Sequence, residues 1–336
     1  MKKTKLRKST VNNLITYAIV ALFYIVVTVM IATGNATRHM QSLLVPICVN
    51  VTLAVSLNLV IGFLGELSLG HAAFMSIGAY TGGLLSIFMK NMFPNLPVMV
   101  RFPLSMLAGG IAGAMFGALV CVVVLRLKGD YLAIVTLAFG EILRSIIINL
   151  DFTGGPSGLK GVPQDASFTY GIILVFLTLF VINNLAKSKH GRAIQALRDN
   201  TIAATSVGIN ATKYKLMVFA LAAFFAGMAG VLYSHNYSII NAGTFDYNKS
   251  IEILVMVVLG GIGSVRGSVI AGALIAVIPE MLRSLQDYRM LIYAIVLIVM
   301  MLGTSNEKLK LLIAKYSPVQ FVKNTLAAKK VKKEEK

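Results

Sequence analysis

Long apolar stretches recur along almost the whole chain, and they constrain its fold more than any other feature. A helix needs about 20 mostly apolar residues to cross the hydrocarbon core of a bilayer. Stretches of this kind, some slightly shorter, lie at residues 14–32, 43–64, 72–89, 104–125, 131–149, 170–185, 214–234, 251–263, 268–285 and 290–303. They predict an all-α, polytopic transmembrane helical bundle with about ten spans. The eighth stretch is short and ends in glycine, so a count of eight or nine stays open.

The charged residues support a membrane protein. Only 13% of the residues are charged, whereas a soluble domain usually carries about a quarter, so we exclude a soluble enzyme. The net charge of +18 raises nucleic acid as a partner. The basic residues, however, form short patches between apolar stretches, and no basic groove with interleaved aromatic residues is present. We therefore expect no nucleic-acid binding, and we expect the positive charge to set the orientation in the membrane.

The distribution of the basic residues predicts that orientation. With the N-terminus in the cytoplasm, ten spans leave 23 basic residues in cytoplasmic segments and 7 in outer segments. Because lysine and arginine concentrate in cytoplasmic loops, this bias favours an even number of spans with both termini cytoplasmic. The first stretch resembles a signal peptide, but it exceeds the usual apolar length of about 7–15 residues. We expect it to remain as a helix.

The expected organisation follows from these spans. Residues 1–13 form a basic cytoplasmic N-terminus, residues 14–303 form the transmembrane domain, and residues 304–336 form a basic cytoplasmic tail. A cytoplasmic loop at residues 187–215 interrupts the transmembrane domain. The end of the tail is rich in lysine and poor in apolar residues, so it is either disordered or lies along anionic lipid.

Two glycine-rich segments, residues 62–71 and 260–267, join apolar stretches with almost no loop between them. Either both are tight turns at the cytoplasmic surface, or they are helix breaks whose freed backbone groups line a translocation path. The candidate residues on the second interpretation are Glu66, Ser68, Gly70, His71, Gly260 and Gly261.

Two charged residues, Glu141 and Arg144, lie inside the stretch 131–149. They are three positions apart, so on a helix they share a face and can pair. An ionisable residue inside the membrane points to function by default, and this pair is a candidate for the translocation path. A mutually neutralised pair can also lock two helices together, and the depth of the pair in the membrane would separate the two roles.

The predicted outer loop 151–169 contains Thr153, Gly154, Gly155 and Pro156. Glycine supplies positive φ and proline fixes its own φ, so this sequence is typical of turns. The loop is longer than a minimal connection. It either docks a partner on the outer face or is an ordinary surface loop.

The loop 187–215 is long, polar and basic, unlike the others. Residues 191–208 read as a short amphipathic helix, with apolar and small residues on one face and charged ones elsewhere. The first face comprises Ile194, Leu197, Thr201, Ala204 and Gly208, and the charged residues include Arg192, Arg198 and Asp199. Such a helix lies on the membrane surface or docks in a groove of another protein.

The sequence carries no motif for catalysis or metal binding. The four histidines lie far apart, and Cys48 and Cys121 lie inside apolar stretches, so we expect neither a metal site nor a disulfide. A phosphate-binding loop, a nucleophile elbow and a zinc-protease helix are all missing. If the function uses ATP, a separate subunit must hydrolyse it.

Several short motifs resemble a known family. They are GELSLGHAAF at residues 65–74, RLKGDYLAIVTL at 126–137, TGGP at 153–156, FAGMAG at 225–230 and GGIGS at 260–264. Each motif is weak alone, but their order and content over roughly residues 45–285 resemble the permeases of branched-chain amino acid ABC importers. The likeness is to the LivM type rather than to its shorter partner permease.

The resemblance implies a heteromeric importer in the bacterial inner membrane. It implies a second permease subunit, two cytoplasmic ATPase subunits that bind ATP and magnesium, and an extracytoplasmic substrate-binding protein. The segment 191–210 then corresponds to the family's coupling loop, and Ala203, Ala204 and Gly208 match its Ala-Ala-x-x-x-Gly core. Gly191, Arg192, Arg198 and Asp199 complete the expected contacts to the ATPase.

The chain departs from the family pattern at two places. Glu66 stands where glutamine is common, so its carboxylate either pairs with Arg266 or titrates. Thr201 and Ile202 stand where an acidic residue is common, which leaves the polar ATPase contacts to the charged residues of the loop. Branched-chain amino acids are the expected substrates. The alternatives are another small solute, such as urea, an amide, a polar amino acid or a sugar, and a transporter that works without ATP.

Overall fold

A computed structural model describes residues 8–33, 38–125, 127, 129–281, 294, 295 and 298. The chain divides into two compact units, Met1–Val277 and Ile278–Lys336, and almost all described residues belong to the first. Residues 1–7 of the predicted N-terminal segment, most of the tenth span and the tail 304–336 lie outside the described residues, whereas residues 8–13 belong to the first helix.

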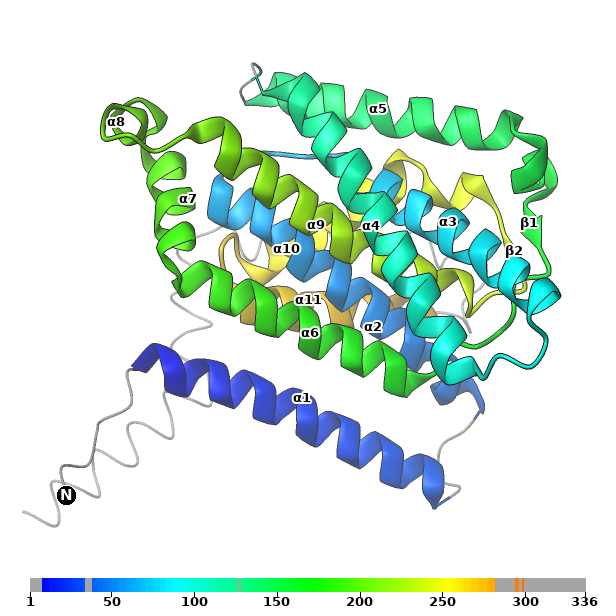
Figure 1. Ribbon diagram of the computed structural model, residues 1–336. Helices are drawn as coiled ribbons and strands as arrows, with labels where there is room; N and C mark the ends of the chain where they lie inside the picture. Colours follow the sequence, from blue (N-terminus) through cyan, green and yellow to red (C-terminus); the bar gives the residue numbers. More distant parts are fainter. Residues whose placement is uncertain are drawn as a thin grey trace, which may run out of the picture. The chain divides into compact units, whose positions relative to one another are not determined.

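The described residues are almost entirely helical, as the apolar stretches predict (Figure 1). The long helices are α1 (Lys8–Ala32), α2 (Arg38–Asn58), α3 (His71–Met92), α4 (Val98–Val124), α5 (Asp130–Asn149), α6 (Phe168–Lys187), α9 (Ala211–Ser234), α10 (Tyr247–Gly260) and α11 (Val265–Met281). Among the described residues, six helices are long and apolar enough to cross a membrane: Met40–Leu64, α3, α4, α5, α6 and α9. The predicted eighth span, residues 251–263, is displaced in the structure, because α10 begins at Tyr247 and ends at Gly260.

Helix α9 is the centre of the packed core, and it contacts α3 and α4 through glycines. A Cβ atom added to Gly230 would collide with the carbonyl oxygen of Met75 on α3, and one added to Gly78 would collide with the backbone of Gly227 on α9. Without Cβ atoms the helix backbones come into direct contact. Phe74, Phe219 and Phe225 fill the space between these helices and are fully buried.

Short elements close the two ends of the helices (Figure 1). At one end, α7 (Lys189–Asp199) and α8 (Thr201–Ser206) connect α6 to α9. At the other end, β1 (Leu159–Lys160) pairs antiparallel with β2 (Ile239–Ile240), next to three single turns of 3₁₀ helix at Asp151–Thr153, Gly155–Ser157 and Ala242–Phe245. The two short strands are a small correction to the prediction of a purely α-helical chain.

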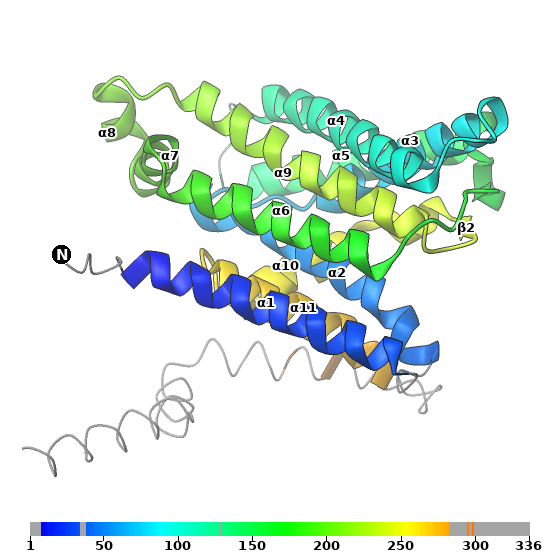
Figure 2. The same cartoon turned by 60° about the horizontal axis from the view of Figure 1, so that its bottom comes forward.

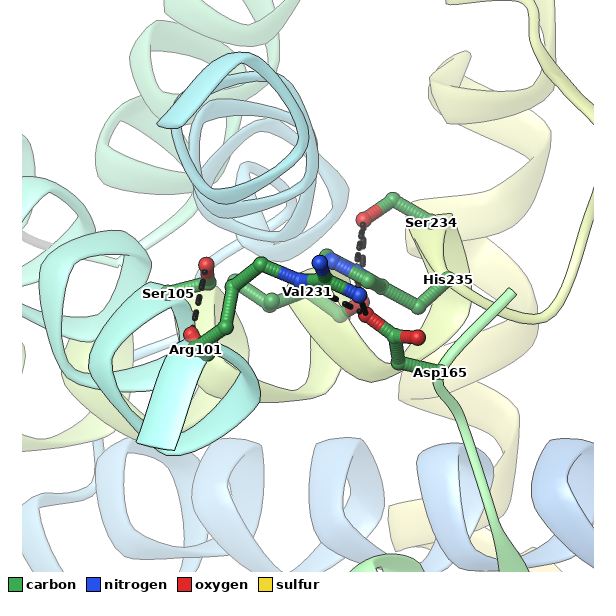
Figure 3. A network of polar contacts seen from close by, with 6 residues as sticks. All are labelled: Arg101, Ser105, Asp165, Val231, Ser234 and His235. Carbon is green, nitrogen blue, oxygen red and sulfur yellow. Dashed lines mark hydrogen bonds and ion pairs between the residues drawn. The ribbon is translucent and has the colours of Figure 1, made fainter. Parts of the chain in front are cut away.

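The β1–β2 end also holds a buried polar cluster (Figure 3). Arg101 of α4 donates to Asp165 at 2.6 Å, and the two side chains are only 8% and 11% exposed. His235, at the end of α9, lies beside this pair and bonds through Nδ1 to the carbonyl of Val231 at 2.9 Å. The cluster therefore joins α4, the segment before α6 and the end of α9.

Helix α1 lies alongside α6 (Figure 2). The hydroxyl of Tyr17 donates to the carbonyl of Leu179 at 3.3 Å, and the ring of Tyr24 packs on Phe168. Most other apolar side chains of α1, among them Leu22 and Ile25, are exposed, as expected for a helix that faces lipid.

Candidate functional site

The first predicted break lies within the helical bundle. Helix α2 passes into a π-helical turn, Leu59–Leu64, and Gly65 then takes a left-handed conformation with a φ of 80°. Residues 65–70 have no regular structure before α3 begins at His71. We call residues 59–70 the helix break. A π-helical turn inside an α-helix often marks a functional position.

Hydrogen bonds show how far the helix break reaches into the bundle. The Leu69 N–H donates to the Thr136 hydroxyl at 3.0 Å, and Thr136 lies in the second turn of α5. The His71 ring pairs with the Ser56 hydroxyl at 2.8 Å. Ser68, Gly70 and His71 are buried. This segment is therefore a break inside the packed helices, and a simple surface turn does not describe it.

The second glycine-rich segment is a tight turn that packs on the first. Gly261 and Gly263 take positive φ values of 87° and 83°, which ends α10 after Gly260 and turns the chain into α11. The Gly263 N–H donates to the side-chain oxygen of Asn58 at 2.9 Å. A Cβ atom on Gly62 would collide with the backbone of Gly263. The structure thus brings together two segments that the sequence presents as separate candidates.

A small pocket lies between the helix break, α5 and the start of α10. It measures about 170 Å³ and is too narrow to admit a water-sized sphere. Its lining residues are Leu69, Ala73, Leu137, Gly140, Glu141, Phe245, Asp246, Tyr247 and Ser250. We call this space the central pocket. It places the predicted residue Glu141 next to the segment that contains Gly70 and His71.

Helix α10 begins at the central pocket. The Tyr247 N–H donates to Glu141 at 3.2 Å, and Glu141 lies in the middle part of α5. Asp246 caps the new helix by accepting from the Lys249 N–H at 3.0 Å. Sequence reasoning missed Asp246, Tyr247 and Ser250. The signal was present, because an aspartate about one helical turn before an apolar stretch can act as a helix N-cap.

Glu141 and Arg144 form the predicted ion pair at 2.8 Å. Their side chains are 31% and 35% exposed, so the rest of the chain does not fully cover the pair. Ile134 and Ile142 on the same helix are more than half exposed. A pair of charges on a face of an apolar helix is costly against lipid, which indicates that protein or water covers this part of α5.

The predicted helix over residues 191–208 is two helices. Asn200 lies between α7 and α8 with an extended backbone, and its side-chain oxygen caps α8 by accepting from the Ala203 N–H at 3.0 Å. A single continuous helix is therefore wrong, because the asparagine cap starts a new one. The face of small and apolar residues predicted from the spacing is buried at Ile194, Leu197 and Ala204. These residues pack on the chain itself, whereas the sequence predicts a face on the membrane surface or in a groove of another protein.

Gly191 and Gly208 differ in their surroundings. A Cβ atom on Gly191 would collide with the carbonyl oxygen of Leu185 at the end of α6, so this glycine lets α7 pack closely. Gly208 is exposed, has a φ of 88° and has open space around it. The spacing predicts that Gly208 shares a face with Ile194 and Leu197, but Gly208 is exposed whereas those two residues are buried.

The outward side of the α7–α8 segment is partly apolar. Ile202 and Val207 are 76% and 77% exposed, and sequence reasoning did not single them out as exposed residues. Ala203 of α8 and Arg192 and Asp199 of α7 are exposed as well. We call Ile202 and Val207 the exposed apolar pair.

Glu66, in the helix break, forms an ion pair with Lys215 of α9. The two side chains are 15% and 11% exposed, so the charges are largely buried and neutralise each other. Lys215 was not among the two expectations for Glu66, which were pairing with Arg266 and titration.

The predicted turn at residues 153–156 is confirmed, since Gly154 and Gly155 take positive φ values of 82° and 54°. Thr153 is buried and its hydroxyl donates back to the carbonyl of Ile147 at 2.6 Å. Pro156 is exposed. Thr153 thus closes the end of α5, and the neighbouring residues form the surface of the turn.

Across the part of the chain that the structure describes, no group of histidine, cysteine, aspartate or glutamate residues has the arrangement of a metal site. Cys48 and Cys121 are free thiols and both are buried.

Comparison with known proteins agrees with this arrangement. Residues 39–301 match the family model described as the branched-chain amino acid transport system / permease component. The chain belongs to this family and is a multi-pass membrane protein.

Individual relatives give a finer comparison. The chain is 35% identical over 75% of its length to the high-affinity branched-chain amino acid transport system permease protein LivM of Salmonella typhimurium. It is 34% identical over 75% of its length to LivM of Escherichia coli. In both cases the match spans 65% of the relative's length. The ribose import permease protein RbsC of Haemophilus influenzae is 28% identical over 76% of this chain and 81% of the relative. No solved structure matches the chain.

Proposed function

We propose that this protein is the transmembrane permease subunit of an ATP-driven importer that moves branched-chain or other small hydrophobic amino acids across the bacterial inner membrane. The observation that carries the proposal is the α7–α8 segment. Its inward face packs on the bundle through Ile194 and Leu197, while the exposed apolar pair points away from it. An apolar patch on a polar connecting segment is typical of a protein docking site.

The occupant of that docking site is one of two cytoplasmic ATPase subunits, which carry ATP and magnesium. The exposed apolar pair enters an apolar groove of the ATPase, and the exposed Arg192 and Asp199 of α7 make polar contacts. Closure of the ATPases on ATP then moves the α7–α8 segment and switches the bundle between inward-open and outward-open states. This chain itself binds no cofactor.

The topology of the proposal has about ten spans with both termini in the cytoplasm. Nine of the ten apolar stretches overlap long helices among the described residues. The tenth stretch, residues 290–303, lies largely outside them. The bias of basic residues supports the orientation, and it puts the α7–α8 end inside and the β1–β2 end outside.

The translocation path of the proposal passes the open side of α5. The Glu141–Arg144 pair is a third exposed there and is unsuited to lipid. A second permease subunit covers this side, so that the path runs between two chains and beside the central pocket. The turn with Gly154, Gly155 and Pro156 faces the extracytoplasmic binding protein that delivers the substrate.

The experiment is affinity purification in mild detergent, followed by ATP-driven uptake of leucine in liposomes that contain every recovered subunit. We expect recovery of a second permease and of ATPases with phosphate-binding loops. Purification of the chain alone, together with solute uptake that needs no ATP, would contradict the proposal.

A single variant tests the docking surface. Gly208→Arg places a large cation beside the exposed apolar pair, in open space where it does not disturb the packing. We expect uptake to be lost while ATP hydrolysis continues. Gly161→Arg is the matched control, because Gly161 also has positive φ and open surroundings but lies at the other end. Normal uptake by the Gly208 variant would refute the assignment of this surface.

A sugar importer is the second candidate, favoured by the similarity to the ribose import permease of Haemophilus influenzae. The same liposomes distinguish the two. Uptake of ribose in preference to leucine, with the binding protein encoded beside this permease, would replace the amino-acid assignment.

A further inference from the structure

Arg198, near the end of α7, points back into the protein from a segment that docks a partner. Its guanidinium donates to the carbonyl oxygen of Gly62 in the helix break at 3.0 Å. The same group donates to Asp199 at 3.1 Å and 3.0 Å. The aliphatic stem packs on the helix break as well, because a Cβ atom on Gly65 would lie 2.5 Å from Cγ of Arg198. Arg198 therefore contacts the helix break with its aliphatic carbons and with its guanidinium group.

Lys215 makes a second contact with the helix break. It lies in the second turn of α9 and pairs with Glu66, one residue beyond Gly65. Helix α8 lies between Arg198 and Lys215 in the sequence. The exposed apolar pair is thus carried on a short segment that is tied to the helix break at both of its ends.

The helix break connects the contacts of Arg198 and Lys215 to the interior of the helical bundle. At Gly62 it touches the turn between α10 and α11. At Leu69 it lines the central pocket and bonds to Thr136 of α5. A displacement of α8 is therefore passed to residues 62–66 first, and from there to one wall of the central pocket.

We propose that Arg198 and the Glu66–Lys215 pair are positioning residues that transmit movement of the docked segment to the helix break. The inference rests on the proposed function and adds the residues through which the ATPases act on the membrane part. It assigns Arg198 mainly to an internal contact, where the sequence pattern assigned it to the ATPase surface.

The test measures uptake of leucine and hydrolysis of ATP in the same liposomes, with the complete importer. The variants are Arg198→Met and Lys215→Met. We expect the ratio of uptake to hydrolysis to fall by about 10-fold, within the usual range of coupling between two sites. Lys213→Met is the matched control, since Lys213 is an exposed lysine in the first turns of the same helix. Its ratio should equal that of the original protein.

Exchanging the two charges of the Glu66–Lys215 pair distinguishes transmission of movement from a local loss of structure. Glu66→Lys combined with Lys215→Glu restores an ion pair with its charges reversed. We expect this double variant to recover much of the ratio of uptake to hydrolysis that Lys215→Met loses. Recovery of the ATPases with each variant shows that the importer has assembled. Where Lys215→Met does not assemble, Arg198→Lys carries the test, because lysine keeps the charge and loses the forked donors.

An unchanged ratio in Arg198→Met and Lys215→Met, or in Arg198→Lys where only that variant assembles, overturns the proposal. The failure of the proposed function has a different signature, because the unmodified chain would then show no ATP-driven uptake. Measurement of the unmodified chain therefore distinguishes failure of the proposed function from failure of this inference.

Discussion

The two ends of the helices are closed by different kinds of contact. At the β1–β2 end, backbone pairing joins Leu159 to Ile240, and a buried ion pair joins Arg101 to Asp165. At the α7–α8 end, irregular backbone in the helix break meets the turn at Gly263, and long side chains from α7 and α9 reach it. The first end is cross-linked by backbone pairing and by buried side chains. The second end is cross-linked to the segment that carries the exposed apolar pair.

This difference indicates a division of roles. Paired strands and a buried arginine that donates two hydrogen bonds to one carboxylate oxygen hold one geometry, since any shift breaks several bonds at once. Positive-φ glycines and a π-helical turn permit small changes of backbone angle. We expect the β1–β2 end to contribute mainly to stability and the α7–α8 end to contribute mainly to transport per ATP.

The largest effect on stability is expected at the β1–β2 end. Arg101→Met leaves the carboxylate of Asp165 buried without its partner, which should cost about 3–5 kcal/mol of unfolding free energy. Thermal unfolding of the purified protein in detergent measures this. Lys90→Met, at an exposed position at the end of α3, is the control and should unfold like the original protein. An Arg101 variant of undiminished unfolding temperature would remove the contrast between the two ends.

A smaller loss of stability is expected from Gly62→Ala, at the contact between the helix break and the turn that contains Gly263. The new methyl group collides with backbone, and such overpacking costs about 1–3 kcal/mol. Transport per ATP should fall as well, which distinguishes this variant from Arg101→Met. Gly140→Ala is the control for stability, because its methyl group would meet Ala73 at an ordinary 3.6 Å. Full transport by the Gly62 variant would contradict the role given to the helix break.

The smallest effect on stability is expected from Ile202→Ser in the exposed apolar pair. The side chain is 76% exposed, and such surface substitutions usually change stability by less than about 0.5 kcal/mol. Recovery of the ATPases in affinity purification should nevertheless fall sharply. Ser206→Ala, an exposed change on the same helix, should not affect recovery. Equal recovery with both variants would mean that the ATPase docks elsewhere.

The sequence locates the six described helices that are long and apolar enough to cross a membrane, because the thickness of the bilayer fixes their length. Helical spacing also predicts the Glu141–Arg144 pair and groups Ile194 with Leu197 on one face of α7. It does not predict that Gly62 meets Gly263, or that Glu66 pairs with Lys215, because no local pattern specifies which distant segments meet. The single helix over residues 191–208 is the avoidable error, since Asn200 three residues before Ala203 is a recognisable N-cap.

The glycine contacts of α9 with α3 and α4 have a mechanical consequence. At Gly230 and Gly78 the helix backbones touch directly, and the side chains around these contacts are closely packed. The three helices should then move as a single stiff block during a transport cycle. Widening of the central pocket has to come from the elements that border this block, namely α5, α10 and the helix break. A substrate in transit would thus pass beside α5, α10 and the helix break, while α3, α4 and α9 keep their relative positions.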